Sequence, residues 1–127
     1  MRIDPYLSVD GMPFTISEAA LRLQFGAPLE VSRSMVGLNE LDYGEAVYRF
    51  QDNGRLEEVT KRAHVLHIAT VAVPFDTLAA FIAATDPGRF ERAGFIVSPR
   101  CGIAFVPAQG PWVTALARHC IDSWRSL

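Results

Sequence analysis

Hydrophobic and polar residues alternate most clearly along residues 45–62, in two runs on either side of an Asp-Asn-Gly turn. A period of two predicts strands, and a short loop that ends in glycine predicts that they form a β-hairpin. A three-residue loop places Phe50 opposite Leu56 and Arg49 opposite Glu57, so that apolar residues and opposite charges face each other. We therefore expect a hairpin in this register.

Three further segments have the composition of strands. Residues 64–75 form a nearly unbroken β-branched and apolar run, which is typical of a central strand. Residues 93–98 and 102–106 are short apolar runs joined by a tight turn, and residues 29–36 carry a weaker strand pattern. The runs at 45–62, 64–75, 93–98 and 102–106 are expected to share one sheet.

Two segments between these strands have helical spacing and recognisable ends. Thr15 and Glu18 have the spacing of a capping box, and the helix that follows should end at Gly26. Asp76 is in a position to cap a second helix, which residues 86–88 (Asp-Pro-Gly) should terminate.

A third helix is predicted from Pro111, a residue favoured in the first helical turn. Its apolar stripe follows the i, i+3, i+4 rule and consists of Val113, Leu116, Ala117, Cys120, Ile121 and Trp124. The expected fold is α+β, with a mostly antiparallel sheet of about five to six strands and about three packed helices. Residues 1–127 should form one domain, because no linker or repeat divides them.

Composition excludes several classes of protein. Half of the 127 residues are hydrophobic, as in an ordinary globular domain, and the net charge of −2 gives no basic footprint for nucleic acid. The apolar runs at residues 68–75 and 78–84 are too short to span a bilayer. The chain starts without an apolar signal segment, and two cysteines cannot form a disulfide framework. We expect a soluble cytoplasmic protein with reduced thiols and no membrane partner.

Charge is distributed unevenly along the chain. Residues 1–60 contain ten acidic and five basic side chains, whereas residues 61–127 contain four acidic and seven basic ones. An acidic half can attract a basic partner and accelerate association, because complementary potentials steer the encounter. The alternative is an ordinary solvated hairpin face.

Metal and thiol chemistry find little support in the sequence. His64 and His67 lie three residues apart in a predicted strand, so they should point to opposite faces and cannot chelate one ion. His119 and Cys120 are adjacent in a predicted helix and should diverge by about 100°. Cys101 lies in a predicted turn, where exposure beside Arg100 would favour its thiolate, but no base accompanies it in sequence.

Paired carboxylates are also poorly placed for acid–base catalysis. Glu57 and Glu58 should alternate across a strand, and Glu40 and Asp42 lie in a predicted loop. No phosphate-binding glycine motif and no nucleophile elbow occurs. We therefore expect no catalytic residue, no cofactor and no metal, and predict that the protein is not an enzyme.

Residues 36–44 are the best candidate for a recognition loop. They carry Leu38, Leu41 and Tyr43 among carboxylates, and a loop that combines an aromatic anchor with charges suits binding. The alternative is that these apolar side chains fold back onto the edge of the sheet.

The order of these motifs resembles a known group of proteins. The resemblance is carried by Phe25-Gly26-Ala27-Pro28 after the first helix, Leu41-Asp42-Tyr43-Gly44, Asp52-Asn53-Gly54-Arg55-Leu56-Glu57, Gly102-Ile103-Ala104-Phe105 and a last helix with tryptophan. The layout is similar to that of the small immunity proteins encoded beside bacterial polymorphic toxins, particularly those of contact-dependent growth inhibition.

The resemblance implies a protein that binds and neutralises a cognate protein toxin, possibly a nuclease, in the cytoplasm of the producing cell. The acidic half and the candidate loop then predict toxin contacts at Glu40, Leu41, Asp42, Tyr43, Arg49 and Glu57. Two alternatives stay open: a small-ligand-binding or regulatory domain with a pocket between helix and sheet, and an enzyme with a dispersed site. The toxin's activity, the stoichiometry and the oligomeric state are not predicted.

Overall fold

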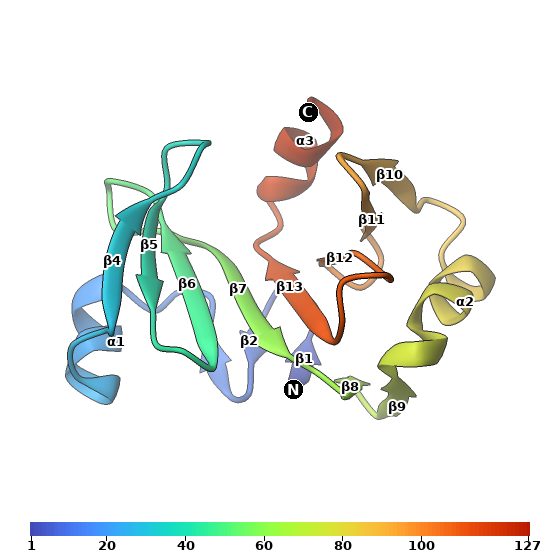
Figure 1. The fold of residues 1–127 in the computed structure, drawn as a ribbon, viewed down its shortest axis with the longest axis horizontal. Helices are drawn as coiled ribbons and strands as arrows, with labels where there is room; N and C mark the ends of the chain where they lie inside the picture. The colour runs from blue at the N-terminus through green and yellow to red at the C-terminus, as the bar shows by residue number, and fades with distance from the viewer.

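The computed structural model describes residues 1–127 and has the expected α+β class (Figure 1). It contains thirteen strands rather than five to six, and three helices. The strands are β1 (Arg2–Asp4), β2 (Ser8–Val9), β3 (Met12–Pro13), β4 (Glu30–Arg33), β5 (Asn39–Asp42), β6 (Ala46–Phe50), β7 (Leu56–Arg62), β8 (Val65–Ile68), β9 (Val71–Pro74), β10 (Phe90–Arg92), β11 (Phe95–Ser98), β12 (Ile103–Phe105) and β13 (Trp112–Leu116). The helices are α1 (Glu18–Phe25), α2 (Phe75–Thr85) and α3 (Cys120–Arg125).

The strands form two sheets, not the single sheet that was predicted. The larger sheet has eight strands in the order β10-β11-β12-β13-β7-β6-β5-β4, all antiparallel. The smaller sheet has five strands in the order β3-β2-β1-β8-β9, and its β1–β8 pair is parallel. Helix α1 lies at the β4–β6 end of the molecule, and α2 lies at the opposite end beside β9 (Figure 1).

The predicted hairpin is present as β6 and β7, with a change of register. Phe50 lies opposite Leu56, as expected, but Arg49 lies opposite Glu58. The predicted Arg49–Glu57 pair is wrong because a β-bulge inserts Glu57 as an extra residue in β7. Beyond the bulge every pair is displaced by one residue.

Residues 64–75 do not form one central strand. They form the hairpin β8–β9, which reverses at Ala69 and pairs with β1 in the smaller sheet. Ala69 has a φ of 52°, a left-handed conformation that glycine or asparagine usually adopts. The reversal therefore carries no ordinary turn residue, and the sequence pattern conceals it.

Helices α1 and α2 end at the predicted breaks but start differently. Ser17, not Thr15, caps α1, since its hydroxyl accepts a hydrogen bond from the Ala20 N–H at 3.1 Å. Pro74 precedes α2 without a side-chain cap, so Asp76 lies inside the first turn instead of capping it.

The predicted third helix is mostly a strand. Residues 112–116 form β13, which lies between β7 and β12 and pairs with both. Val113 and Ala115 belong to the main core, whereas Leu116 contacts α3, as the alternation of a strand requires. Only the last part of the predicted stripe is helical, in the six-residue α3.

Both sheets share one core of 21 buried residues, and a second cluster of six lies under α3. Strand β12 joins the two, because Ile103 and Phe105 face the main core while Ala104 faces the α3 cluster. Strand β12 is thus buried on both faces, with the main core on one side and α3 packed on the other. No helix of the structure has the length and apolar character needed to cross a membrane.

Candidate functional site: a groove beside α3

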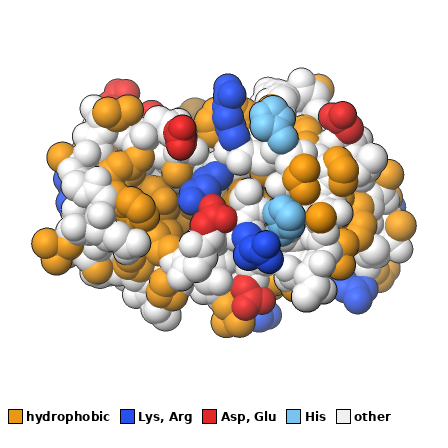
Figure 2. All heavy atoms as spheres, turned by 90° about the horizontal axis from the view of Figure 1, so that it is seen from below, with side chains coloured by type: hydrophobic (Ala, Val, Ile, Leu, Met, Phe, Trp, Pro, Cys, Tyr) orange, Lys and Arg blue, Asp and Glu red, His pale blue; other side chains and the backbone are white.

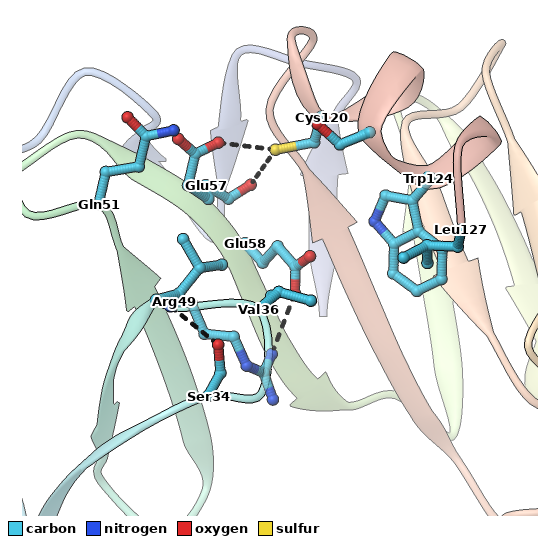
Figure 3. Close-up of a pocket in the computed structure, with 11 residues that line it drawn as sticks. Ser34, Val36, Arg49, Gln51, Glu57, Glu58, Cys120, Trp124 and Leu127 are labelled. Atoms are coloured by element: carbon cyan, nitrogen blue, oxygen red, sulfur yellow. Dashed lines mark hydrogen bonds and ion pairs between the residues drawn. The ribbon is translucent and has the colours of Figure 1, made fainter.

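A groove of about 330 Å³ lies between α3 and the β4–β5 turn (Figure 3). Val36 and Leu38 contribute apolar side chains from the turn, and Trp124 and Leu127 contribute them from α3 and the residues after it. The complete lining is Ser34, Val36, Leu38, Arg49, Gln51, Glu57, Glu58, Cys120, Ser123, Trp124 and Leu127. The groove therefore combines an apolar rim with a charged floor.

The bulge in β7 builds the floor of this groove. Because Glu57 is the extra residue, Glu57 and Glu58 both line the groove instead of alternating across the sheet as predicted. Glu57 is 3% exposed, so its carboxylate is removed from solvent. Bulges commonly redirect side chains in this way beside functional sites.

Arg49 connects the charges on the groove face of the sheet. Its Nε donates to Glu40 at 2.7 Å, and its Nη1 donates to Thr60 at 2.7 Å and to Glu58 at 3.4 Å. Burial raises the pKa of Glu58, and the charge of Arg49 opposes this rise in part. Arg49, Glu40 and Glu58 therefore form an internal ion-pair network. The guanidinium of Arg49 is already bonded to residues of its own chain.

Glu57, His119 and Cys120 meet at the end of the groove next to α3. The Cys120 thiol donates to Glu57 Oε2 at 2.8 Å, and His119 Nε2 contacts the same oxygen. The Ala117 N–H donates to the Glu57 carbonyl at 2.9 Å, which ties the start of α3 to β7. His119 and Cys120 were expected to diverge, but Glu57 reaches the space between them.

The protonated thiol of this cluster is not an activated nucleophile. Burial raises the pKa of Cys120, and its hydrogen bond to the Glu57 carboxylate raises it further. Nucleophilic catalysis requires a thiolate, which this environment disfavours. Attack by sulfur is therefore disfavoured in this environment.

Other cysteine and histidine positions give no second cluster of this kind. Cys101 is 5% exposed, so the exposure that its turn position allowed is not found in the structure. Within this turn the Cys101 N–H donates a buried hydrogen bond to Ser98 Oγ at 3.2 Å. Both cysteines are free thiols. His64 is exposed and His67 is half-buried.

The predicted recognition loop is largely a strand. Residues 39–42 form β5, and Leu41 is fully buried in the main core. Leu41 therefore cannot be a surface contact, and Glu40 is bound to Arg49. Because side chains alternate along β5, Leu41 points into the core. This agrees with the alternative that the apolar side chains of residues 36–44 fold back onto the sheet.

Asp42 and Tyr43 are half-buried and lie beside an exposed apolar cluster. Tyr43 donates to the Gly26 carbonyl at 2.9 Å and packs edge-on against Phe25, whose exposed fraction is 49%. Leu29 is 80% exposed, and its N–H donates to the Asp42 carbonyl at 2.8 Å. Glu30 lies opposite Asp42 in the sheet. These residues (Phe25, Leu29, Glu30, Asp42 and Tyr43) are called the α1–β4 surface.

Figure 2 views the molecule from the side on which this surface lies. Hydrophobic side chains gather at the end that carries α1, and charged side chains lie closer to the middle of this face. Apolar side chains thus gather on this face near the end of the molecule that carries α1.

The acidic first half does not form one broad acidic face. Six of its ten acidic residues are in ion pairs: Asp10, Glu18, Glu40, Asp52, Glu57 and Glu58. Of the other four, Asp42 and Glu45 lie at the β5–β6 turn, and Glu30 lies opposite Asp42 in the sheet. Free negative charge is thus concentrated beside the α1–β4 surface.

Comparisons with protein-family models, curated proteins and solved structures give no match to this chain.

Proposed function

We propose that this protein binds a cognate protein toxin and neutralises it, with the α1–β4 surface as the contact. The observation that carries the proposal is the exposed apolar cluster at Phe25 and Leu29, next to Glu30 and Asp42. Exposed apolar patches with a polar rim are typical of protein–protein contact sites. Aromatic side chains are frequent energetic anchors of such patches, and the half-buried Tyr43 packs against Phe25 within this one.

The unpaired edge of the larger sheet extends this surface. Strand β4 ends the strand order, so its outer backbone groups have no neighbouring strand. Val31 on this edge is 55% exposed, and Met35 and Val36 in the following turn are 106% and 67% exposed. A partner can therefore add a strand to β4 while its side chains contact these apolar residues.

The charge of the surface favours a basic partner. Glu30, Asp42 and Glu45 have no ion-pair partner in the structure, whereas Arg33 at the other end of β4 is paired with Asp52. Uncompensated negative charge raises the association rate with a positively charged surface. A toxin that acts on nucleic acid carries such a surface, because it must bind phosphates.

Growth rescue tests this proposal directly. The proposal requires a toxin gene beside the gene for this chain, and the absence of such a gene would contradict it. The toxin domain of that neighbour is expressed in a sensitive strain, with or without the protein. Wild-type protein should restore growth, and Leu29→Asp should lose most of the protection, because it places a charge in the apolar contact. Leu7→Asp is the matched control, since Leu7 is 64% exposed but lies in the turn between β1 and β2.

The two failures have different meanings. If wild-type protein gives no protection against the neighbouring toxin, the proposed function is wrong. If Leu29→Asp protects as well as wild type while remaining folded by circular dichroism, the function stands but the α1–β4 surface is not the contact.

A second candidate function is the binding of a small ligand in the α3 groove. Its volume of about 330 Å³ suits a small molecule, and Trp124 faces a floor that contains Arg49 and Gln51. A ligand with an aromatic or apolar part and one polar group fits this lining. Screening by tryptophan fluorescence tests it, with Trp124→Phe as the variant that should lose the ligand-dependent change.

A further inference from the structure

The cluster at the end of the α3 groove brings together one oxygen, one nitrogen and one sulfur ligand. The relevant atoms of Glu57, His119 and Cys120 lie within 4.8 Å of one another. We propose that these three residues form a zinc-binding site, whose fourth position opens into the groove.

The distances suit a zinc ion after a small movement. Zinc forms bonds of about 2.0–2.3 Å to such ligands, so neighbouring ligand atoms in a tetrahedral site lie about 3.3–3.8 Å apart. Glu57 Oε2 and Cys120 Sγ are now 2.8 Å apart, which is a hydrogen-bond distance. Admission of the ion requires the Glu57 and His119 side chains to rotate so that this contact opens.

The backbone of the site is held from both sides. Glu57 is fixed by the β-bulge, and its carbonyl accepts the Ala117 N–H at 2.9 Å. The Cys120 N–H donates to the Ala117 carbonyl at 3.0 Å, so the cysteine is attached to the same point. Such fixed spacing keeps ligands together and lowers the cost of ordering them around an ion.

The donor set selects the class of metal. Thiolate and imidazole ligands favour zinc over magnesium or calcium, which require oxygen donors. Arg55 Nε lies 3.4 Å from the other oxygen of Glu57 and would orient the carboxylate as an outer-shell partner. On binding, the Cys120 thiol releases its proton to solvent, and neutral His119 coordinates through Nε2.

Three protein ligands leave one of four zinc positions for an exchangeable water. Glu57 and Cys120 both line the groove, whose lining also includes Gln51 and Ser123, so a molecule would reach this position through the groove. The groove then offers a Lewis-acidic centre to a carboxylate or phosphate of a molecule that enters it. This site is separate from the α1–β4 surface and does not depend on toxin binding.

Cobalt is the probe for the test, because Co²⁺ bound to thiolate gives a charge-transfer band in the near ultraviolet that oxygen and nitrogen ligands do not give. Metal-free protein should bind one Co²⁺ per chain with this band, and Zn²⁺ should displace it. Cys120→Ser should abolish the band, and His119→Gln should weaken Co²⁺ affinity at least ~10-fold. Cys101→Ser is the matched control and should retain both the band and the affinity.

A hydrogen-bonded tether between β7 and α3 is the competing account of the same contacts. Absence of the thiolate band in folded wild-type protein, or its survival in Cys120→Ser, would show that the cluster is only such a tether. Because His119 is 36% exposed at its side chain, His119→Gln should fold even if Cys120→Ser does not. An unchanged Co²⁺ affinity in His119→Gln would likewise overturn the proposal.

Discussion

Arg49→Met is the substitution whose effect the structure specifies most fully. Arg49 makes hydrogen bonds to Glu40, Glu58 and Thr60 across three strands of the larger sheet. Methionine retains most of the aliphatic stem, so packing along the sheet is largely preserved. The main loss is therefore electrostatic, and it leaves two carboxylates facing each other without their cation.

The size of this loss follows from distances and exposure. The Arg49, Glu40 and Glu58 side chains are 21%, 26% and 15% exposed, so solvent screens their interaction only in part. A hydrogen bond to a charged group contributes about 1.5–3 kcal/mol, and breaking a fully buried pair costs about 3–5 kcal/mol. Because these residues are only partly buried, we expect about 2–3 kcal/mol of lost unfolding free energy near neutral pH.

The pH dependence has a definite sign. Burial raises the pKa of Glu58 above its unfolded value, and Arg49 opposes that rise. A carboxyl with a raised folded-state pKa contributes stability below its unfolded pKa of about 4.3, and this contribution disappears as pH rises through the folded-state pKa. Removal of Arg49 raises the folded-state pKa further. The variant should therefore lose more stability near pH 7 than near pH 4.

Urea unfolding at about pH 7 and about pH 4 measures both quantities. The matched control is Arg33→Met, which breaks an ion pair to Asp52 with an N–O distance of 2.5 Å. The Arg33 and Asp52 side chains are 53% and 71% exposed, so this control should lose much less stability despite its shorter contact. Equal losses for the two variants, or an Arg49→Met loss that does not shrink in acid, would refute this reasoning.

Two further predictions concern the turns around β11 and β12. Burial alone would raise the pKa of Asp86, but hydrogen bonds from Ser98 and the Arg100 N–H lower it overall. Asp86→Asn should therefore lower the free energy of unfolding by about 2 kcal/mol at neutral pH. This loss should diminish as the pH falls below about 3.9 and through the folded-state pKa of Asp86. A loss that does not change with pH in urea unfolding would contradict this prediction. Gly102 has a φ of 65°, and an added Cβ would lie 3.0 Å from the Tyr6 ring. Gly102→Ala should cost about 1–3 kcal/mol, and an unchanged thermal midpoint would show that the turn relaxes freely.

Local signals predicted those parts of the fold that local interactions determine. The Asp-Asn-Gly turn located the β6–β7 hairpin, and the Gly26 and Asp86 breaks located two helix ends. The α1 cap was misassigned because Thr15 and Ser17 are both capping residues, and only the backbone decides which one is used.

Pairing between strands that are distant in sequence determined those parts of the fold that the sequence pattern did not predict. The 113–124 stripe satisfies helical spacing, yet β13 gains hydrogen bonds from β7 on one side and β12 on the other, which a helix would forgo. The candidate zinc ligands depend on a contact between Glu57 and Cys120, which are 63 residues apart. A bulge creates that contact, and no signal in the sequence marks its position.

Binding kinetics with the neighbouring toxin domain, at low and high salt, test the central claim most directly. Leu29→Ala should increase the dissociation rate about 5-fold to 30-fold, the equivalent of about 1–2 kcal/mol, with little change in association. The double variant Glu30→Lys/Asp42→Lys should instead slow association and reduce its dependence on salt. Leu7→Ala, the exposed leucine of the smaller sheet, should leave both rates unchanged. Wild-type rates in Leu29→Ala and in the double variant would contradict binding through the α1–β4 surface.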